Sequence, residues 1–479
     1  MPAEARQRTV ILRLQALLAA QDQGRDVKKC IFAVLVVLAT PAYSKVSAEQ
    51  AARLGQDLTR IGAEKTAAPA TPHGLSIPAY TGGFSKPNDS NTAQAPADPY
   101  AADEPLLVID SSNAAQYADI LSVGQQALLK NYPATFRMRV YPTRRSAAVP
   151  EHVAQATQAN ATSVELKPGG NGFTGTAHGF PFPIPASGQE LIWNHMARYR
   201  TTGFRGFTNS AATTSSGSYV VERAYLEAVI QYGNPDIALG DWDNDLAMIL
   251  RKVVAPANKA GDTVLLHVPM DREADDIQIW SYNPGTRKVR RIAEVGYDNP
   301  AQNGLITHDQ VDMFNGPLDR YNFKLIGKKA VLVPYNNYAL HSPDVKYADI
   351  VHKGHPNPDL LRYELHRTWV LEATIKDDVS HVYSKRVMYL DEDSWLILLA
   401  DMYDQRGEFW RTSMAFALQY PQIPLPDNSL QAHFDLQSRR YVMLNMQNEE
   451  RTPMSYNHVA PPSHFTTSAL KRFATQQHR

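Results

Sequence analysis

Residues 361–375 constrain the fold more than any other part of this sequence. Two sets of alternate positions differ in character: Tyr363, Leu365, Arg367, Trp369, Leu371, Ala373 and Ile375 against Arg362, Glu364, His366, Thr368, Val370, Glu372 and Thr374. Because successive side chains of a β-strand point to opposite faces, this pattern predicts a strand with one apolar face and one face in water. Its apolar face needs a covering layer.

Short turns separate the strands that are predicted after this segment. An acidic turn at 391–394 joins two apolar stretches, 382–390 and 395–403, and a second turn at 405–408 leads to 409–418. Turns of this length connect antiparallel neighbours, so the region is predicted to be a meander, with a last hairpin at 433–444. Because no strand–helix–strand alternation appears, a parallel sheet is not expected.

A further hairpin is predicted at 277–293. Ile277, Ile279 and Ser281 share one face of its first strand, and the opposite face carries Gln278, Trp280 and Tyr282. The turn Asn283-Pro284-Gly285 reverses the chain, because proline presets φ and glycine accepts positive φ. The returning strand carries a basic rim of Arg287, Lys288, Arg290 and Arg291.

The hairpin motif W-x-Y-x-P-x-x-R-x-V at 280–289 resembles the periplasmic lipoprotein-sorting proteins of the LolA/LolB carrier superfamily. More closely, the chain is identified as similar to the domain-of-unknown-function 1329 family, described as outer-membrane lipoprotein-sorting-like. The matching pieces are IPAYTGG (77–83), YPTRRS (141–146), FPFPIP (180–185), GYDNP (296–300), DMFNG (312–316), YSKR (383–386) and DEDSW (391–395). This resemblance implies an α+β fold: an open, incomplete barrel of curved antiparallel sheet, covered by helices, with an extended N-terminal arm.

The first residues predict export. Residues 28–44 begin with two lysines, continue with a short apolar run and end in small residues, which is typical of a secretory signal peptide cut near Ser44 and Lys45. The only cysteine, Cys30, lies inside that signal, so a periplasmic, soluble protein without disulfides is expected. With 48 basic and 48 acidic residues, the chain has no electrostatic footprint for nucleic acid.

Four regions are expected along the chain. Residues 1–44 hold an upstream extension and the signal peptide, and 45–135 hold N-terminal helices and an extended arm. Residues 136–447 are expected to form the curved sheet with its covering helices, among them one at 191–199 that Ser187 caps. The segment 448–479 is expected to be a loosely ordered tail.

Several motifs suggest chemistry, and each has an ordinary structural interpretation that we favour. The glycine pattern at 170–175 lacks the following helix that a dinucleotide site requires. The acidic run at 241–245 has Leu246 and Lys252 where a calcium loop needs Gly and Glu. His352, His355 and His366 lack zinc-ligand spacing, so neither metal nor other cofactor is expected.

The apolar inventory favours a carrier. If the curved sheet and its helices leave a cavity, we expect its wall to include Trp193, Trp280, Tyr282, Met313, Phe314, Trp369, Trp395 and Trp410. Arg287, Arg290 and Arg291 are candidates for an anionic head group or a partner. The leading hypothesis is a non-catalytic periplasmic carrier or docking protein that moves a lipid or other hydrophobic molecule between inner and outer membranes. The resemblance implies an inner-membrane transporter and an outer-membrane barrel as partners.

Two alternatives remain open. One is a periplasmic hydrolase that uses paired carboxylates drawn from Glu364, Glu372, Asp391, Glu392 and Asp393. The other is a scaffold for a membrane transport complex that binds no small molecule. An enclosed apolar cavity favours the carrier, converging acids in a polar cleft favour the hydrolase, and a filled core favours the scaffold.

Overall fold

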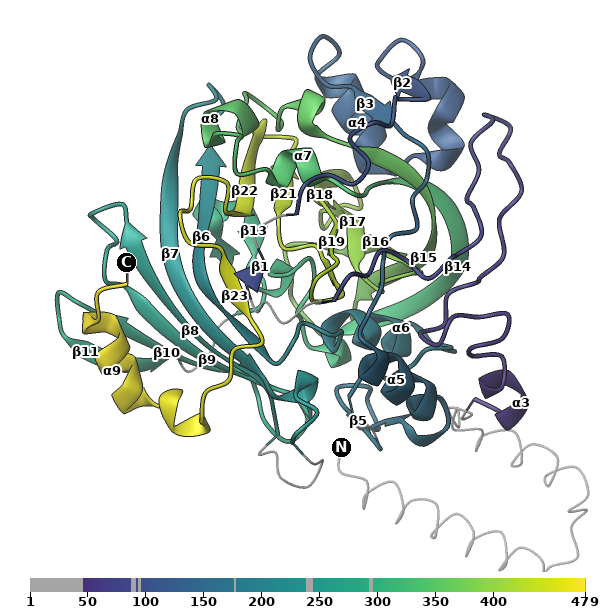
Figure 1. Cartoon of the computed structure of the whole chain (residues 1–479). Helices are drawn as coiled ribbons and strands as arrows, with labels where there is room; N and C mark the ends of the chain where they lie inside the picture. Colours follow the sequence, from purple (N-terminus) through teal and green to yellow (C-terminus); the bar gives the residue numbers. More distant parts are fainter. Residues whose placement is uncertain are drawn as a thin grey trace, which may run out of the picture. The chain divides into compact units, whose positions relative to one another are not determined.

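The residues of the alternating segment form strand β15 (Tyr363–Ile375), which lies near one end of a long antiparallel sheet (Figure 1). The computed structural model describes residues 46–87, 92–93, 96–175, 178–237, 244–292 and 296–478. The predicted signal peptide, its predicted cleavage site near Ser44 and most of the acidic run at 241–245 lie outside these described residues. None of the helices in these ranges is long and apolar enough to cross a bilayer.

Within the described ranges the main sheet has 17 strands. Its continuous antiparallel path runs β11-β10-β9-β8-β7-β6-β22-β21-β18-β17-β16-β15-β14. The remaining bounds on this path are β6 Gly203–Thr213, β7 Tyr219–Ile230, β8 Asp245–Ala255, β9 Thr263–Pro269, β10 Gln278–Asn283, β11 Lys288–Ile292, β14 Tyr321–Pro334, β16 Lys385–Asp391, β17 Ile397–Tyr403, β18 Phe409–Ala415, β21 Gln431–Asp435 and β22 Arg440–Met446. The predicted meander and both hairpins are confirmed.

Short strands and helices surround this path. Four strands join the main sheet at its margins: β1 Thr92–Ala93, β2 Leu107–Ile109, β3 Met138–Val140 and β23 Met454–Tyr456. Three small hairpins pair β4 Glu165–Leu166 with β5 Phe173–Thr174, β12 Pro300–Ala301 with β13 Ile306–Thr307, and β19 Leu418–Tyr420 with β20 Leu425–Asp427. The helices are α3 Ala48–Ala51, α4 Val123–Asn131, α5 Glu151–Ser163, α6 Gly188–Met196, α7 Tyr338–His341, α8 Tyr347–Ile350 and α9 Thr467–Thr475.

Helix α6 begins where its capping signal predicts. The Ser187 side chain accepts a hydrogen bond from the Glu190 backbone N–H, which satisfies one of the donors left free at a helix start. Its first residue, Gly188, lies so close to the sheet that a Cβ atom there would come within 2.7 Å of Phe323 and 2.8 Å of Leu371. Only glycine permits this approach, which seats α6 directly on β14 and β15.

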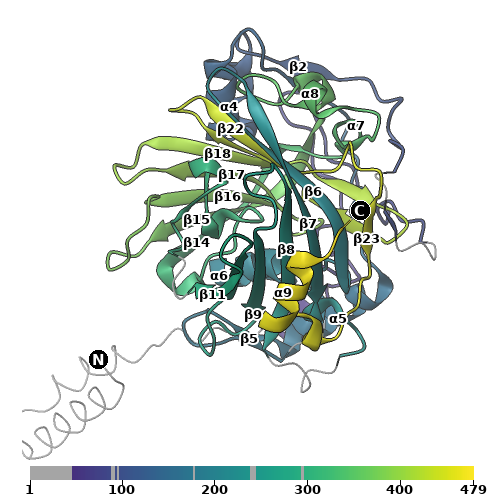
Figure 2. The same ribbon diagram turned by 90° about the vertical axis from the view of Figure 1, so that its left-hand side faces the viewer.

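One buried cluster shows which face of the sheet is concave. Trp193 of α6 packs in a cluster that includes Val268 near one end of the sheet and Leu371 near the other. Strands that are far apart in the sheet order meet the same cluster only if the sheet curves around it. The open, curved antiparallel sheet with covering helices is therefore confirmed (Figures 1 and 2).

The first half of the polar face of β15 is buried, contrary to the prediction that this face lies in water. Glu364, His366 and Thr368 are each 1% exposed or less. The segment after β3 and the residue pair after β14 cover this face: Glu364 accepts hydrogen bonds from the Arg144 backbone N–H and from the Asn336 side chain. Charged groups on this face pair with one another, which alternation in a sequence does not reveal.

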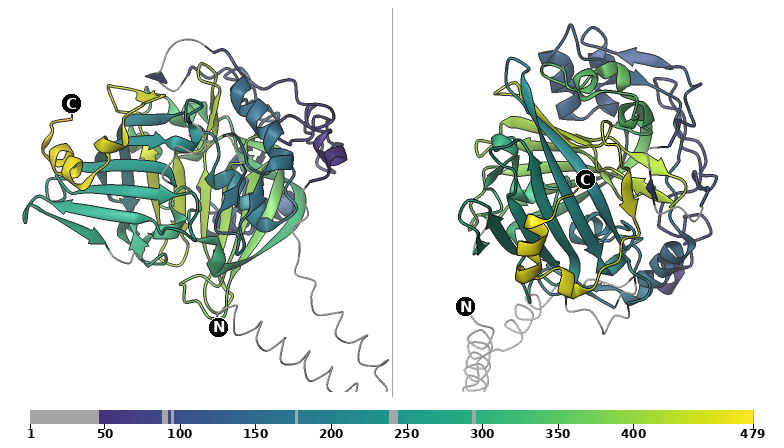
Figure 3. Two further views of the ribbon diagram at one scale, coloured as in Figure 1. Left: turned by 90° about the horizontal axis from the view of Figure 1, so that it is seen from below. Right: turned by 60° about the vertical axis from the view of Figure 1, so that its left-hand side comes forward.

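The C-terminal segment is ordered, so the predicted loose tail at 448–479 is wrong. Strand β23 pairs with β6, and helix α9 packs on the convex face of β8, β9 and β10 (Figure 3). Leu470 and Phe473, one helical turn apart, are buried against Leu265. The repeated spacing of apolar residues in α9, after a Thr466 cap, was the overlooked signal.

Candidate functional site

Part of the concave face is filled by protein. Helix α6 and residues 296–320 are together called the plug. They pack against β14–β18 and against the ends of β7–β9 that hold Ile230, Ala247 and Val268. The plug contributes Trp193, Met313, Phe314 and Leu318 to a continuous buried cluster. The remaining concave surface belongs to β6–β11, here called the wing.

The wing presents a line of apolar side chains to the concave side. Direct strand pairing joins Phe204 to Ala228, Ala228 to Ile249, Ile249 to Leu266, Leu266 to Ile279 and Ile279 to Ile292. We call these six residues the concave row. Directly opposite residues share a face, so the row is continuous across six strands. Ala228 is buried, Ile292 is 38% exposed, and the other four are half-buried.

A pocket of about 220 Å³ lies at the inner end of the concave row. Phe204, Leu226 and Ile249 supply its wing side, and Val311 of the plug, 46% exposed, also lines it. Pockets that enclose a drug-sized ligand usually measure about 300–1,000 Å³. A long hydrophobic ligand therefore cannot fit in this pocket alone and would extend outward along the row.

Charged residues close the plug side of this pocket. Arg198 Nη2 lies 2.6 Å from Asp312 Oδ1, and Arg200 Nη2 lies 2.5 Å from Asp312 Oδ2. Burial would raise the pKa of Asp312, but the two guanidinium groups hold it below its usual range. Asp312 and Met313 both adopt positive φ, at 59° and 70°. A left-handed backbone conformation costs free energy in a non-glycine residue. Two such residues in succession mark a loop that its surroundings hold firmly in place.

Six of the eight predicted cavity residues lie in or against the plug cluster. Trp193, Met313, Phe314 and Trp395 are at most 1% exposed, while Trp369 and Trp410 are partly buried and pack on the same cluster. The buried four fill the concave side instead of lining a cavity, so the prediction is wrong for them. The two tryptophans are also fixed by hydrogen bonds within the protein. The indole N–H of Trp193 donates to the Gly170 carbonyl, and that of Trp395 donates to the Ile61 carbonyl.

The other two predicted residues, Trp280 and Tyr282, lie on the convex face of the wing. Both pack in the small cluster beneath α9, on the opposite side of the sheet from the concave row. The structure therefore separates them from any concave ligand. The predicted head-group candidates Arg287, Arg290 and Arg291 are exposed at the free edge formed by β11 and its turn.

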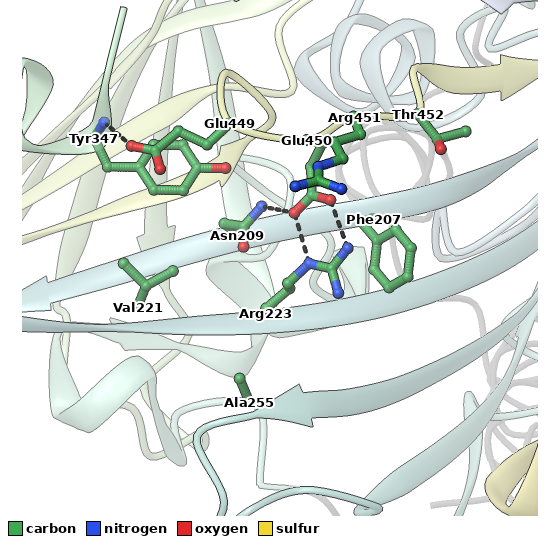
Figure 4. Close-up of a pocket in the computed structure, with 10 residues that line it drawn as sticks. All are labelled: Phe207, Asn209, Val221, Arg223, Ala255, Tyr347, Glu449, Glu450, Arg451 and Thr452. Atoms are coloured by element: carbon green, nitrogen blue, oxygen red, sulfur yellow. Dashed lines mark hydrogen bonds and ion pairs between the residues drawn. The ribbon is translucent and has the colours of Figure 1, made fainter. Parts of the chain in front are cut away.

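Two further pockets lie outside the concave face. One, of about 530 Å³, is on the convex face of β6 and β7 (Figure 4). There Glu450 accepts two hydrogen bonds from Arg223 and one from Asn209, so its carboxylate is fully engaged. The other, of about 660 Å³, lies between the N-terminal arm and the start of α5. Neither pocket is lined by the concave row.

The carboxylates considered for hydrolysis are engaged in ion pairs. Glu364, Asp391, Glu392 and Asp393 are at most 3% exposed beneath the N-terminal arm, and none of them lines the three pockets described above. The Asp393 carboxylate accepts hydrogen bonds from both Nε and Nη2 of Arg145, at 2.8 and 2.6 Å. Glu372 lies on the same face toward the other end of β15 and is half-buried near Lys385. This arrangement leaves no pair of acids facing a cleft.

His366 belongs to the same buried network. Its Nε2 lies 3.2 Å from Glu364 Oε2, and its Nδ1 lies 3.5 Å from Asp391 Oδ1. Burial would lower the pKa of His366, but these carboxylates raise it to about 9. His366, Asp391 and Asp393 are close enough to share a cation. However, Arg145 already pairs with both carboxylate oxygens of Asp393, so Asp393 is not free to bind a metal ion.

The raised pKa of His366 predicts that stability falls at alkaline pH. The folded-state pKa exceeds the unfolded value of about 6.5, so the stabilisation is complete below pH 6.5 and is lost as the pH rises to about 9. The expected loss is roughly 3 kcal/mol. Urea unfolding at a series of pH values measures it. The His366→Gln variant, which cannot titrate there, should show a clearly flatter profile, and an equally steep profile would contradict the assignment.

A buried serine and histidine form another candidate for hydrolysis. Ser413 Oγ lies 2.8 Å from His433 Nδ1, and His433 Nε2 lies 3.1 Å from Gln431 Oε1. Burial lowers the pKa of His433 to about 3. In serine hydrolases the nucleophilic serine likewise contacts a histidine base, and a third group orients that histidine. Here Ser413 and His433 are 0% exposed, so a substrate cannot reach the hydroxyl, and the group is a structural hydrogen-bond chain.

Comparison with known proteins gives consistent matches. A family model described as "Protein of unknown function (DUF1329)" matches residues 108–471. The uncharacterized protein PA3922 of Pseudomonas aeruginosa is 41% identical over 443 residues, which cover 91% of this chain and 96% of that protein.

Three solved structures share low sequence identity with the chain. A putative outer membrane lipoprotein-sorting protein domain from Vibrio parahaemolyticus is 16% identical and covers 59% of this chain and 97% of its own, with a TM-score of 0.41. A DUF1329 family protein from Desulfovibrio piger is 15% identical, with 57% and 92% covered and a TM-score of 0.39. The LolA superfamily protein NE2245 from Nitrosomonas europaea is 14% identical, with 60% and 100% covered and a TM-score of 0.37.

Proposed function

This chain belongs to the DUF1329 family, and we propose that it is a non-catalytic periplasmic carrier that binds an acyl chain or similar hydrophobic molecule along the concave row. The observation that carries this proposal is a line of apolar side chains on the concave face, all of which except Ala228 remain partly exposed. Proteins rarely leave such a surface open unless something binds there.

The dimensions of the concave row suit one acyl chain. Neighbouring strands lie about 4.8 Å apart, so a row across six strands is about 24 Å long. The hydrocarbon core of a bilayer is about 30 Å thick, so one extended acyl chain spans about 15 Å of a leaflet. A single chain therefore fits along the row with its end in the pocket that Val311 lines.

The energy of such contacts is sufficient for reversible binding. Burying an acyl chain contributes about 0.8 kcal/mol per methylene. If one side of the chain faces the row and the other stays in water, roughly half of this is gained, on the order of 5 kcal/mol for a long chain. Binding of this strength allows loading and release without covalent chemistry, which is what transfer between inner and outer membranes requires.

The proposed localisation rests on the sequence. The predicted signal peptide at 28–44 supports export to the periplasm, where transfer between the two membranes takes place. An inner-membrane transporter and an outer-membrane barrel would then be the expected partners at the two ends of the route. The buried carboxylates and the inaccessible Ser413 speak against a hydrolase.

Native mass spectrometry of protein taken from its own periplasm tests the proposal. We expect a fraction of the protein to carry a lipid or other hydrophobic molecule. We also expect the emptied protein to take up a fluorescent fatty acid, because the concave row is half-exposed. Ligand-free spectra together with no uptake of the fatty acid would contradict the carrier.

A further inference from the structure

The free edge of the wing, at the outer end of the concave row, carries a cluster of four positively charged side chains. Arg287, Lys288, Arg290 and Arg291 occupy four of five consecutive positions, and all four side chains are exposed. Among the described residues, none of the ion pairs found involves any of them. The β10–β11 hairpin is the outermost part of the wing, and among the described strands β11 pairs only with β10, so its other edge is free (Figure 1).

We propose that this basic edge docks on an anionic phospholipid bilayer. A negatively charged membrane surface attracts exposed Lys and Arg side chains, each of which strengthens binding roughly fivefold. The charges lie on both faces of the edge strand, because Lys288 and Arg290 share the face of Ile292 while Arg291 shares that of Trp280. Such an edge can approach a planar surface along its length.

Trp280 and Arg291 make the convex side of this edge suited to the interfacial region. The Arg291 guanidinium carbon lies 6.0 Å from the centre of the Trp280 ring, which is half-buried. Tryptophan beside a cation is typical of side chains that lie at the level of lipid head groups. The neighbouring turn adds Pro284 and Gly285, both exposed and uncharged, so the turn itself carries no negative charge toward the membrane.

Docking at this edge would bring the open end of the concave row to the lipid. Ile292 is the outermost residue of the row, and it lies in β11 next to Arg290 and Arg291. A hydrophobic molecule that leaves the bilayer would therefore reach the concave row with little of its path through water. This orientation rests on the proposed function, whereas membrane binding itself does not.

Charge on an edge strand also has a simpler role, because it prevents pairing with the edge of another sheet. That role requires only charge and predicts no preference for anionic lipid. Vesicle binding therefore separates the two. The test measures co-sedimentation of the exported protein with vesicles of phosphatidylcholine alone and with vesicles that also contain phosphatidylglycerol, at low and high salt.

We expect binding only to vesicles with phosphatidylglycerol, weakened by salt because surface charges are screened. The variant R287Q/K288Q/R290Q/R291Q should bind at least tenfold more weakly. A matched control removes four exposed positive charges elsewhere and should bind within twofold of the unmodified protein: K130Q/K324Q/K353Q/R439Q. Equal binding to both vesicle types, no binding to either, or equal losses in the two variants would overturn the proposal.

A second measurement keeps the two proposals distinguishable. Fluorescent fatty-acid binding without vesicles should persist in the edge variant, because the glutamine substitutions leave Ile249, Leu266 and Ile279 in place. If vesicle binding depends on the edge but no fatty acid binds, the carrier fails and docking stands. If fatty acid binds but the edge does not affect vesicle binding, docking fails and the carrier stands.

Discussion

Replacing Arg145 by methionine is expected to lower the free energy of unfolding by about 3–5 kcal/mol, because it leaves buried carboxylates without their cation. Arg145 donates two hydrogen bonds to Asp393 and others to the carbonyls of Glu64 and Pro78. It thereby ties the N-terminal arm to the turn after β16. Chemical denaturation, followed by tryptophan fluorescence, measures the loss.

Two controls make this prediction specific. Arg53→Met removes an exposed ion pair with Asp57 and should cost less than about 1 kcal/mol, since both partners are half in water. Adding Asp393→Asn to Arg145→Met should recover part of the loss, because the second change removes the unpaired charge. If the free energy of unfolding of the Arg145→Met variant stays within about 1 kcal/mol of that of the unmodified protein, the buried network does not hold the arm.

Replacing Leu266 by aspartate is expected to weaken fatty-acid binding at least a hundredfold. Leu266 is one of the two central residues of the concave row and pairs with Ile249 on one side and Ile279 on the other. A carboxylate there must either lose water when the ligand binds or keep the ligand away, and desolvation of an unpaired charge is costly. Titration with a fluorescent fatty acid measures the effect.

The same change at an exposed site elsewhere provides the control. Val459 is 66% exposed and lies outside the wing, so Val459→Asp should leave the affinity unchanged. Because Leu266 is only half-buried, its substitution should also leave the protein folded, as circular dichroism would show. A folded Leu266→Asp protein with normal affinity would remove the concave row from the binding site.

The strands with strong local signals were predictable. The alternation of β15, the turn at Asn283-Pro284-Gly285 and the Ser187 cap of α6 each depend on residues close in sequence, and each is confirmed. Strand β6 was missed because its residues are mostly small or polar and gain their burial from neighbours far away in the chain. Helix α5 was missed because it has few large apolar residues, although Ala and Gln favour helix.

The site was harder to predict than the fold. Aromatic residues such as Trp193 and Trp395 were expected to line a cavity, but sequence does not tell whether a large side chain lines a space or fills it. The concave row consists of single residues from six strands, and only strand register aligns them. One signal was present: Ile279 alternates with Trp280, so its face differed from that of the aromatic pair.

Photo-crosslinking with a diazirine fatty acid tests the central claim most directly. The exported protein is irradiated with the bound probe, digested, and the labelled residues are mapped by mass spectrometry. We predict labels on the concave row and on its pocket, chiefly at Ile249, Leu266, Ile279 and Val311. Labels confined to the convex face around Trp280 or to the pocket around Arg223, or no labelled residue at all, would contradict the account.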